Sequence, residues 1–152
     1  MKHLGLFVLL IAGAVGNGAA LADDDFHAAT DPALKAECGS CHLAFPPELL
    51  PASSWRTMMS GLDKHFGTDA SLDPATAAKI TAFLEQNASR KRKLASEKVL
   101  RITETRWFVR EHSKVPERVW KGEKVKSASN CAACHTNAEQ GDYSERGVRV
   151  PR

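Results

Sequence analysis

The sequence contains only four cysteines among its 152 residues, too few for disulfides to replace a hydrophobic core. After residue 22 no apolar stretch approaches the roughly 20 residues that a membrane-spanning helix needs. No run of alternating apolar and polar residues indicates a β-sheet. These absences predict a mainly α-helical protein, built as one compact domain or two very small units.

The first 22 residues have the layout of a secretory signal peptide. Lys2 begins a short basic region, Leu4–Val15 is an unbroken run of apolar or small residues, and Ala20-Leu21-Ala22 fits a small-x-small cleavage pattern. The alternative is a membrane anchor, but a run of about a dozen residues is too short to span a bilayer. We therefore expect a mature chain that begins at Asp23, functions in the periplasm and is not embedded in a membrane.

The charge is distributed unevenly along the mature chain. Residues 23–87 carry 4 Lys and Arg against 10 Asp and Glu, whereas residues 88–152 carry 16 against 8. Apart from the run Arg90–Lys93, the basic charges are interleaved with acidic ones, which argues against a nucleic-acid-binding surface. We expect the basic half to face an acidic protein partner, and the run to mark a solvated boundary.

Proline, glycine and capping residues divide the chain into short helical segments. Residues 23–30 are expected to form a loose N-terminus. We expect a helix from Asp31-Pro32 to Pro46-Pro47, and a second helix that is capped by Ser53 or Ser54, reaches His65 and stops at Gly67. An amphipathic helix over 75–87 should follow Asp73-Pro74. After it we expect a mixed segment over 98–112, in which Ile102, Trp107, Phe108 and Val109 need burial, and a last short helix capped by Ser127 or Ser129.

All four cysteines occur in two copies of the motif Cys-x-x-Cys-His. One copy is Cys38, Cys41 and His42, and the other is Cys131, Cys134 and His135. On a helix, positions i, i+3 and i+4 share one face, so two thiols and an imidazole would project together. The thiols can then add to the two vinyl groups of one haem while the imidazole reaches its iron. The motif is the attachment signature of haem c, and it predicts two covalent haems with His42 and His135 as proximal ligands.

Three other interpretations of the cysteines are weaker. A four-cysteine zinc site does not explain the His that follows each pair, a coincidence with a chance of about one in six hundred. A thioredoxin-like redox pair needs a βαβ context and would not occur twice. Disulfides closed within each Cys-x-x-Cys loop would be strained.

The sixth position of each iron decides between electron transfer and small-molecule chemistry. Three further histidines remain in the mature chain, and we favour His65 and His112 as the sixth ligands. His65 has glycines on both sides that allow close approach of a ring, and His112 lies beside aromatic residues. Met58 or Met59 is the main rival at the first haem, whereas His27 is expected to be free. Which of the two histidines serves which iron stays open.

Longer stretches resemble the dihaem cytochrome c family of exported bacterial proteins, the DHC type. They are "ECGSCHLAFPPELLPASSWRTMMSGLDKHFGTDASLD", "ITETRWFVREHSKVP" and the C-terminal "CAACH". The resemblance runs from Asp31 to His135. It implies a class I cytochrome c-like N-terminal unit, a smaller C-terminal haem segment, and bis-histidine ligation with His65 and His112 as sixth ligands. It also implies electron transfer to a mono-haem, oxygen-binding cytochrome, and from a membrane b-type cytochrome.

The sequence therefore predicts a periplasmic electron-transfer protein rather than an enzyme. Residues 23–89 would form the N-terminal haem domain and residues 90–152 the C-terminal haem segment. Two imidazole ligands predict a low reduction potential, because a Met thioether would raise it. The first alternative is a small peroxidase or reductase with one open haem. The second is a gas or redox sensor, for which the sequence contains no output domain.

Overall fold

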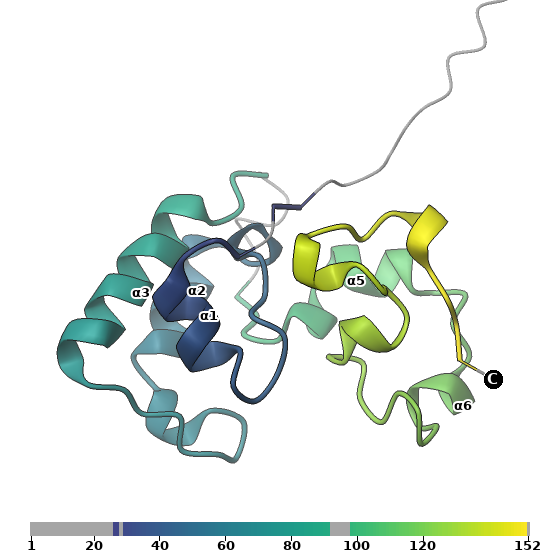
Figure 1. The fold of residues 1–152 in the computed structure, drawn as a ribbon, viewed down its shortest axis with the longest axis horizontal. Helices are drawn as coiled ribbons and strands as arrows, with labels where there is room; N and C mark the ends of the chain where they lie inside the picture. Colours follow the sequence, from purple (N-terminus) through teal and green to yellow (C-terminus); the bar gives the residue numbers. More distant parts are fainter. Residues whose placement is uncertain (1–25, 28, 92–97, 152) are drawn as a thin grey trace, which may run out of the picture.

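The computed structural model describes residues 26–27, 29–91 and 98–151, so the predicted signal peptide and Arg92-Lys93 lie outside the described residues. Figure 1 shows two groups of helices side by side, α1 to α3 in one and α5 and α6 in the other. Within these ranges, the only extended pairing is two isolated β-bridges, His65 with Thr68 and His135 with Val148. The prediction of a mainly α-helical fold is confirmed, whereas the class I-like character of the first group stays a prediction.

The first group contains three α-helices and two 3₁₀ turns. Asp31 and Asp73 cap α1 and α3 as predicted, because their carboxylates accept hydrogen bonds from backbone N–H groups of the first turn. The predicted cap of α2 by Ser53 or Ser54 is wrong, since the helix starts earlier, directly after Pro51. The elements are α1 (Pro32–Cys38), η1 (Pro47–Leu49), α2 (Ala52–Met59), η2 (Leu62–Lys64) and α3 (Pro74–Asn87).

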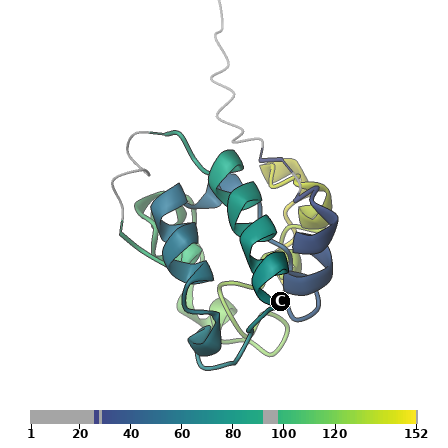
Figure 2. The same cartoon turned by 90° about the vertical axis from the view of Figure 1, so that its left-hand side faces the viewer.

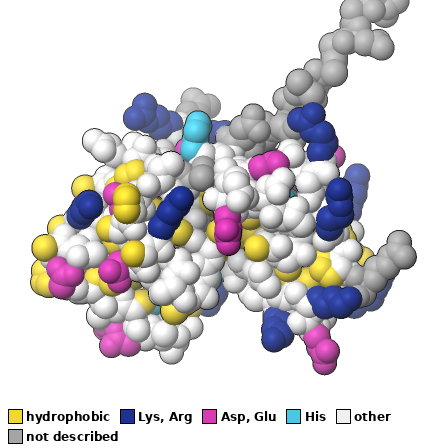
Figure 3. All heavy atoms as spheres, in the orientation of Figure 1, with side chains coloured by type: hydrophobic (Ala, Val, Ile, Leu, Met, Phe, Trp, Pro, Cys, Tyr) yellow, Lys and Arg dark blue, Asp and Glu magenta, His cyan; other side chains and the backbone are white. Residues whose placement is uncertain are grey.

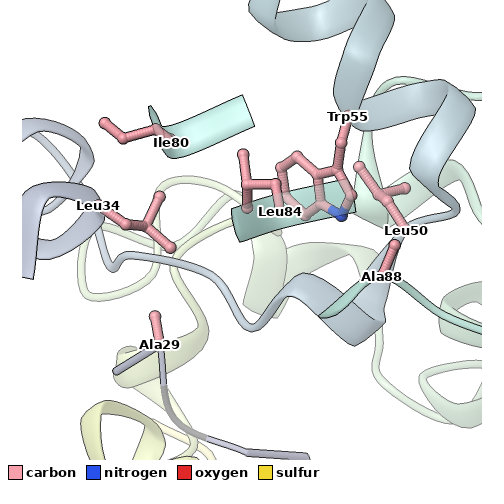
Figure 4. Close-up of a cluster of buried hydrophobic side chains, with 7 residues drawn as sticks. All are labelled: Ala29, Leu34, Leu50, Trp55, Ile80, Leu84 and Ala88. Atoms are coloured by element: carbon pink, nitrogen blue, oxygen red, sulfur yellow. The ribbon is translucent and has the colours of Figure 1, made fainter. Parts of the chain in front are cut away.

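The hydrophobic core of this group lies between its three helices. Figure 2 shows α2 and α3 packed side by side. Ile80 and Leu84 lie four residues apart on one face of α3 and are almost completely buried. The cluster in Figure 4 consists of Ala29, Leu34, Leu50, Trp55, Ile80, Leu84 and Ala88. Val99 and Ile102 pack against it from beyond the predicted domain boundary, which stays a prediction.

Trp55 connects α2 to the turn that precedes it. Its indole Nε1 donates a buried hydrogen bond of 2.7 Å to the carbonyl oxygen of Pro47. We expect Trp55→Phe to lower the free energy of unfolding by about 1–2 kcal/mol, because the substitution removes the donor and leaves a buried carbonyl weakly paired. Denaturant unfolding of the haem-loaded protein measures this change. An unchanged midpoint would show that this hydrogen bond adds nothing to stability.

The second group is built from shorter elements. They are η3 (Ile102–Glu104), α5 (Arg106–Glu111), α6 (Glu117–Trp120), η4 (Cys131–Ala133), η5 (Ala138–Gln140) and η6 (Glu145–Gly147). Thr105 caps α5 by accepting a hydrogen bond from the Phe108 N–H. The predicted burial of Phe108 is confirmed, but Val109 is 57% exposed, because a helix of six residues buries one narrow face. Among the described residues of this group, the buried ones are Thr105, Phe108, Val125, Ala138 and Gly141.

Contrary to the prediction of a loose N-terminus, two of the described residues before α1 are packed, while residues 23–25 and 28 lie outside the described residues. Ala29 is buried in the core of the first group. The Phe26 ring makes edge-to-face contacts with Trp107, at 5.1 Å between ring centroids, and with Tyr143, at 5.8 Å. The segment therefore joins the two groups, a long-range contact that local sequence signals do not reveal.

Among the helices of the described ranges, none has the length and apolar character needed to cross a bilayer.

Candidate haem sites

The first Cys-x-x-Cys-His motif lies at the end of α1 rather than within one helix. The helix ends at Cys38, and Gly39 caps it with its N–H bonded to the carbonyl of Lys35. Cys41 and His42 follow in a turn. The prediction that one helix carries all three side chains as far as Pro46 is therefore wrong. The small Gly39-Ser40 pair permits this early change of direction.

The second motif is a single turn. Cys131–Ala133 form η4, and the N–H of His135 bonds to the carbonyl of Cys131 at 2.8 Å. This bond spans i to i+4, so the local geometry is that of one helical turn. The predicted cap by Ser127 or Ser129 is wrong, because their hydroxyls bond to each other at 2.8 Å.

Each motif histidine has a second histidine facing it. The ring centroids of His42 and His65 lie 6.1 Å apart, with the planes inclined at 22°. Those of His112 and His135 also lie 6.1 Å apart, with the planes at 69°. A metal–imidazole bond of about 2 Å, plus roughly 1 Å from each nitrogen to its ring centre, separates two axial rings on one metal by about 6 Å. Both pairs therefore fit an iron between them.

The other candidate ligands lie elsewhere. Met58 and Met59 pack against the hydrophobic core of the first group. His27, whose side chain is 87% exposed, places its Nδ1 2.9 Å from a carboxylate oxygen of Glu48. His65 does not end α2 as predicted, because that helix stops at Met59 and His65 follows the separate turn η2.

Hydrogen bonds orient two of the four imidazoles. Nδ1 of His42 lies 2.7 Å from the carbonyl oxygen of Leu43, and Nδ1 of His112 lies 2.9 Å from that of Phe108. A carbonyl oxygen can only accept, so Nδ1 carries the proton in both rings. The unprotonated nitrogen is then Nε2, the atom that a metal requires, and such a bond is the usual support for a ligating histidine.

The other two imidazoles are kept neutral by their surroundings. Burial lowers the pKa of His65, and the nearby His42 and Arg101 lower it further. Burial also lowers the pKa of His135, with a contribution from His112, although the Tyr143 backbone and Asp142 oppose it. Nδ1 of His135 is buried and has no hydrogen-bond partner of ordinary geometry among the described residues. Neutral imidazole is the form that binds iron.

The thiols share these apolar surroundings. Burial raises the pKa of Cys38, and it raises that of Cys131 to about 11. Both sulfurs are therefore protonated at neutral pH in the absence of haem, and their surroundings suit a neutral thioether.

Each histidine also contacts an aromatic ring. The closest contact is that of Phe108 with His112, at 4.0 Å between centroids and 18° between planes. Sequence reasoning singled out Phe108 beside His112 but not three other aromatic residues, which lie three to eight residues from their histidines along the chain. They are Phe45 on His42 at 4.9 Å, Trp120 near His112 at 5.8 Å and Tyr143 near His135 at 5.4 Å. Trp107 contacts Phe26, at 5.1 Å between ring centroids.

The two motifs line one cleft of about 880 Å³ between the helix groups. Cys41 and His42 lie on one side of it, and Cys131 on the other. In the described ranges no three His, Cys, Asp or Glu side chains gather as a zinc site would require. A fold of short helices with two thiol pairs, each beside two facing imidazoles, has the design of a c-type cytochrome with two haem sites.

Comparisons with known proteins agree with this class. The family model for dihaem cytochrome c (DHC) matches residues 34–143. A crystal structure of DHC from Rhodobacter sphaeroides is 47% identical, with a TM-score of 0.69, and the match covers 76% of this chain and 99% of that one. A dihaem cytochrome c from Shewanella baltica OS155 is 41% identical, with a TM-score of 0.70 and coverage of 79% and 92%. Among curated proteins none matches.

The chain therefore belongs to the dihaem cytochrome c family. It carries two covalently bound c-type haems, and its class of function is electron transfer.

Proposed function

We propose that His42 and His65 are the axial ligands of the first haem, and His112 and His135 those of the second. The observation that carries this assignment is the 6.1 Å separation within each pair, found twice and each time beside a Cys-x-x-Cys motif. The Nδ1 hydrogen bonds of His42 and His112 support it, because they leave Nε2 available. Cys38, Cys41, Cys131 and Cys134 supply the thioethers.

With both axial positions filled by protein, this chain is a carrier that passes electrons through its two haems. Each haem, when bound, supplies one iron that takes up and releases a single electron. The four histidines would hold the irons, and His65 and His112 would keep small molecules from binding to them. Neutral imidazole ligands favour a low potential. The cleft shared by the two motifs supports rapid transfer between the haems.

We place this carrier in the periplasm because the sequence predicts a signal peptide and because cytochrome c matures outside the cytoplasm. Its partners would be other redox proteins, and the resemblance suggests a mono-haem oxygen-binding cytochrome and a membrane b-type cytochrome. Figure 3 shows Lys and Arg side chains along the C-terminal part of the molecule. Exposed basic residues there include Arg110, Lys114, Arg118, Lys121, Lys124 and Lys126. This surface suits docking of an acidic partner.

Carbon monoxide tests the closed coordination directly. We expect the dithionite-reduced holoprotein to show no change in its Soret and α bands when carbon monoxide is added, because protein ligands occupy both sixth positions. A change equivalent to one of the two haems would contradict the assignment at that site. It would favour the alternative, a small peroxidase or reductase with one open haem.

A further inference from the structure

The loop that carries His65 has an unusual backbone. Phe66 and Gly67 both have positive φ, 50° and 99°, and the N–H of Thr68 bonds to the carbonyl of His65 at 3.0 Å. Two successive positive φ values are typical of a tight turn of the primed class. Gly67 adopts this conformation freely, but Phe66 is a bulky residue that seldom does. Contacts outside the turn must therefore hold Phe66 in place.

Arg101 provides such a contact. Its guanidinium carbon lies 3.9 Å from the centroid of the Phe66 ring, whose other contact is the His65 ring at 4.8 Å. The Phe66 ring therefore contacts both Arg101 and His65, and Phe66 is 45% exposed. Val99 and Ile102 on either side of Arg101 pack against the core of the first group, which fixes the backbone from which the guanidinium reaches Phe66.

Arg101 also brings a permanent charge close to the first site. Its guanidinium stays protonated at every working pH. Glu104 lies 3.7 Å from its Nε and offsets part of the field, but both side chains are about half exposed, so the pair is loose. A nearby positive charge favours the reduced iron, which carries one positive charge fewer.

We propose that Arg101 is a positioning residue for the first haem. Stacked on Phe66, it holds the turn that keeps His65 on the iron, and its charge stabilises the reduced state of that haem. The inference rests on the proposed ligation by His65. It assigns a role at the first haem to a residue that lies beyond the predicted domain boundary, on the segment that leads into the second helix group.

The test uses full-length holoprotein and five variants, of which H65A checks the ligand assignment. R101Q removes charge and stacking, R101K keeps the charge but loses the planar group, and F66L keeps the charge but loses the ring. R56Q is the matched control, because Arg56 is an exposed arginine of the same helix group that pairs with a carboxylate, Glu85, at 2.6 Å. Spectroelectrochemistry gives both potentials. The near-parallel and near-perpendicular histidine pairs give different EPR signals, which assign each potential to its haem.

We expect R101Q to shift the reduced-to-oxidised ratio of the first haem about threefold toward oxidised, roughly 30 mV at 59 mV per tenfold. The second haem should not move, and R101K should stay near the wild-type potential. R101K and F66L should show partial carbon monoxide binding at the first haem, which wild type lacks, since the turn that holds His65 is loosened.

Two results would overturn the inference. If R101Q shifts the first potential no more than R56Q does, the charge has no special role. If F66L and R101K bind no more carbon monoxide than wild type, the stack does not hold the ligand. H65A separates these failures from failure of the ligand assignment. If H65A does not open the first haem to carbon monoxide, His65 is not a ligand and the inference falls with that assignment.

Discussion

His65→Ala and His112→Ala are each expected to open one of the two haems to carbon monoxide. Each substitution removes one imidazole from a pair whose centroids lie 6.1 Å apart, and the remaining described histidine, His27, contacts Glu48 instead. The reduced variant should show a carbon monoxide difference spectrum of about one haem equivalent, and the double variant about two. Optical titration with carbon monoxide measures the stoichiometry.

His27→Ala is the matched control, since His27 contacts Glu48 at an exposed site. It should behave as wild type. If H65A stayed closed and only M58A or M59A opened the first haem, a methionine would be the ligand. If H65A opened the haem of the second motif, the pairing would be crossed.

His112 is held by both the Phe108 carbonyl and the Phe108 ring, so H112A also tests whether α5 keeps its place without the ligand.

Replacing both Cys131 and Cys134 with alanine is expected to unfold most of the second helix group and spare the first. The described part of the second group buries few apolar side chains, namely Phe108, Val125 and Ala138. So small a core cannot offset the conformational entropy of ordering about fifty residues, which costs about 1–2 kcal/mol each. The haem and its two histidines must supply the missing contacts. The first group retains its own haem and its seven-residue core.

Hydrogen exchange followed by mass spectrometry measures the result at the level of segments. Protection should fall to that of an unfolded chain over α5 and the second motif, and stay within about tenfold of wild type in α3. The reciprocal variant, with Cys38 and Cys41 replaced, should damage the first group less, because its apolar core is larger. Full protection of α5 in the variant that lacks Cys131 and Cys134 would show that the second group folds without its haem.

Local chemistry in the sequence predicted much of this fold. Asp31-Pro32 and Asp73-Pro74 start helices because a carboxylate cap and a proline act within one turn. The two motifs predicted the haem thiols and proximal histidines, and counting the remaining histidines predicted His65 and His112, assignments that stay predictions. The helix expected to carry the whole first motif ends at Cys38, and the helix expected to carry the second is a single 3₁₀ turn, Cys131–Ala133.

Contacts between distant residues could not be predicted. Phe26 appeared to belong to a loose end, yet its ring lies against Trp107 and Tyr143, more than eighty residues away along the chain. Nothing near Arg101 in the sequence points to Phe66. Such contacts depend on how the two helix groups pack, and neither periodicity nor capping carries that information.

The core of the first group draws on residues from 29 to 102, all of which precede the second motif. A chain that is exported N-terminus first would deliver this core, with Cys38, Cys41 and His65, before Cys131 emerges. The first group can therefore form its core before the second group has emerged. Phe26, three residues before the buried Ala29, then offers the later segment an aromatic ring that Trp107 and Tyr143 can contact. The order of assembly thus follows the order of the chain.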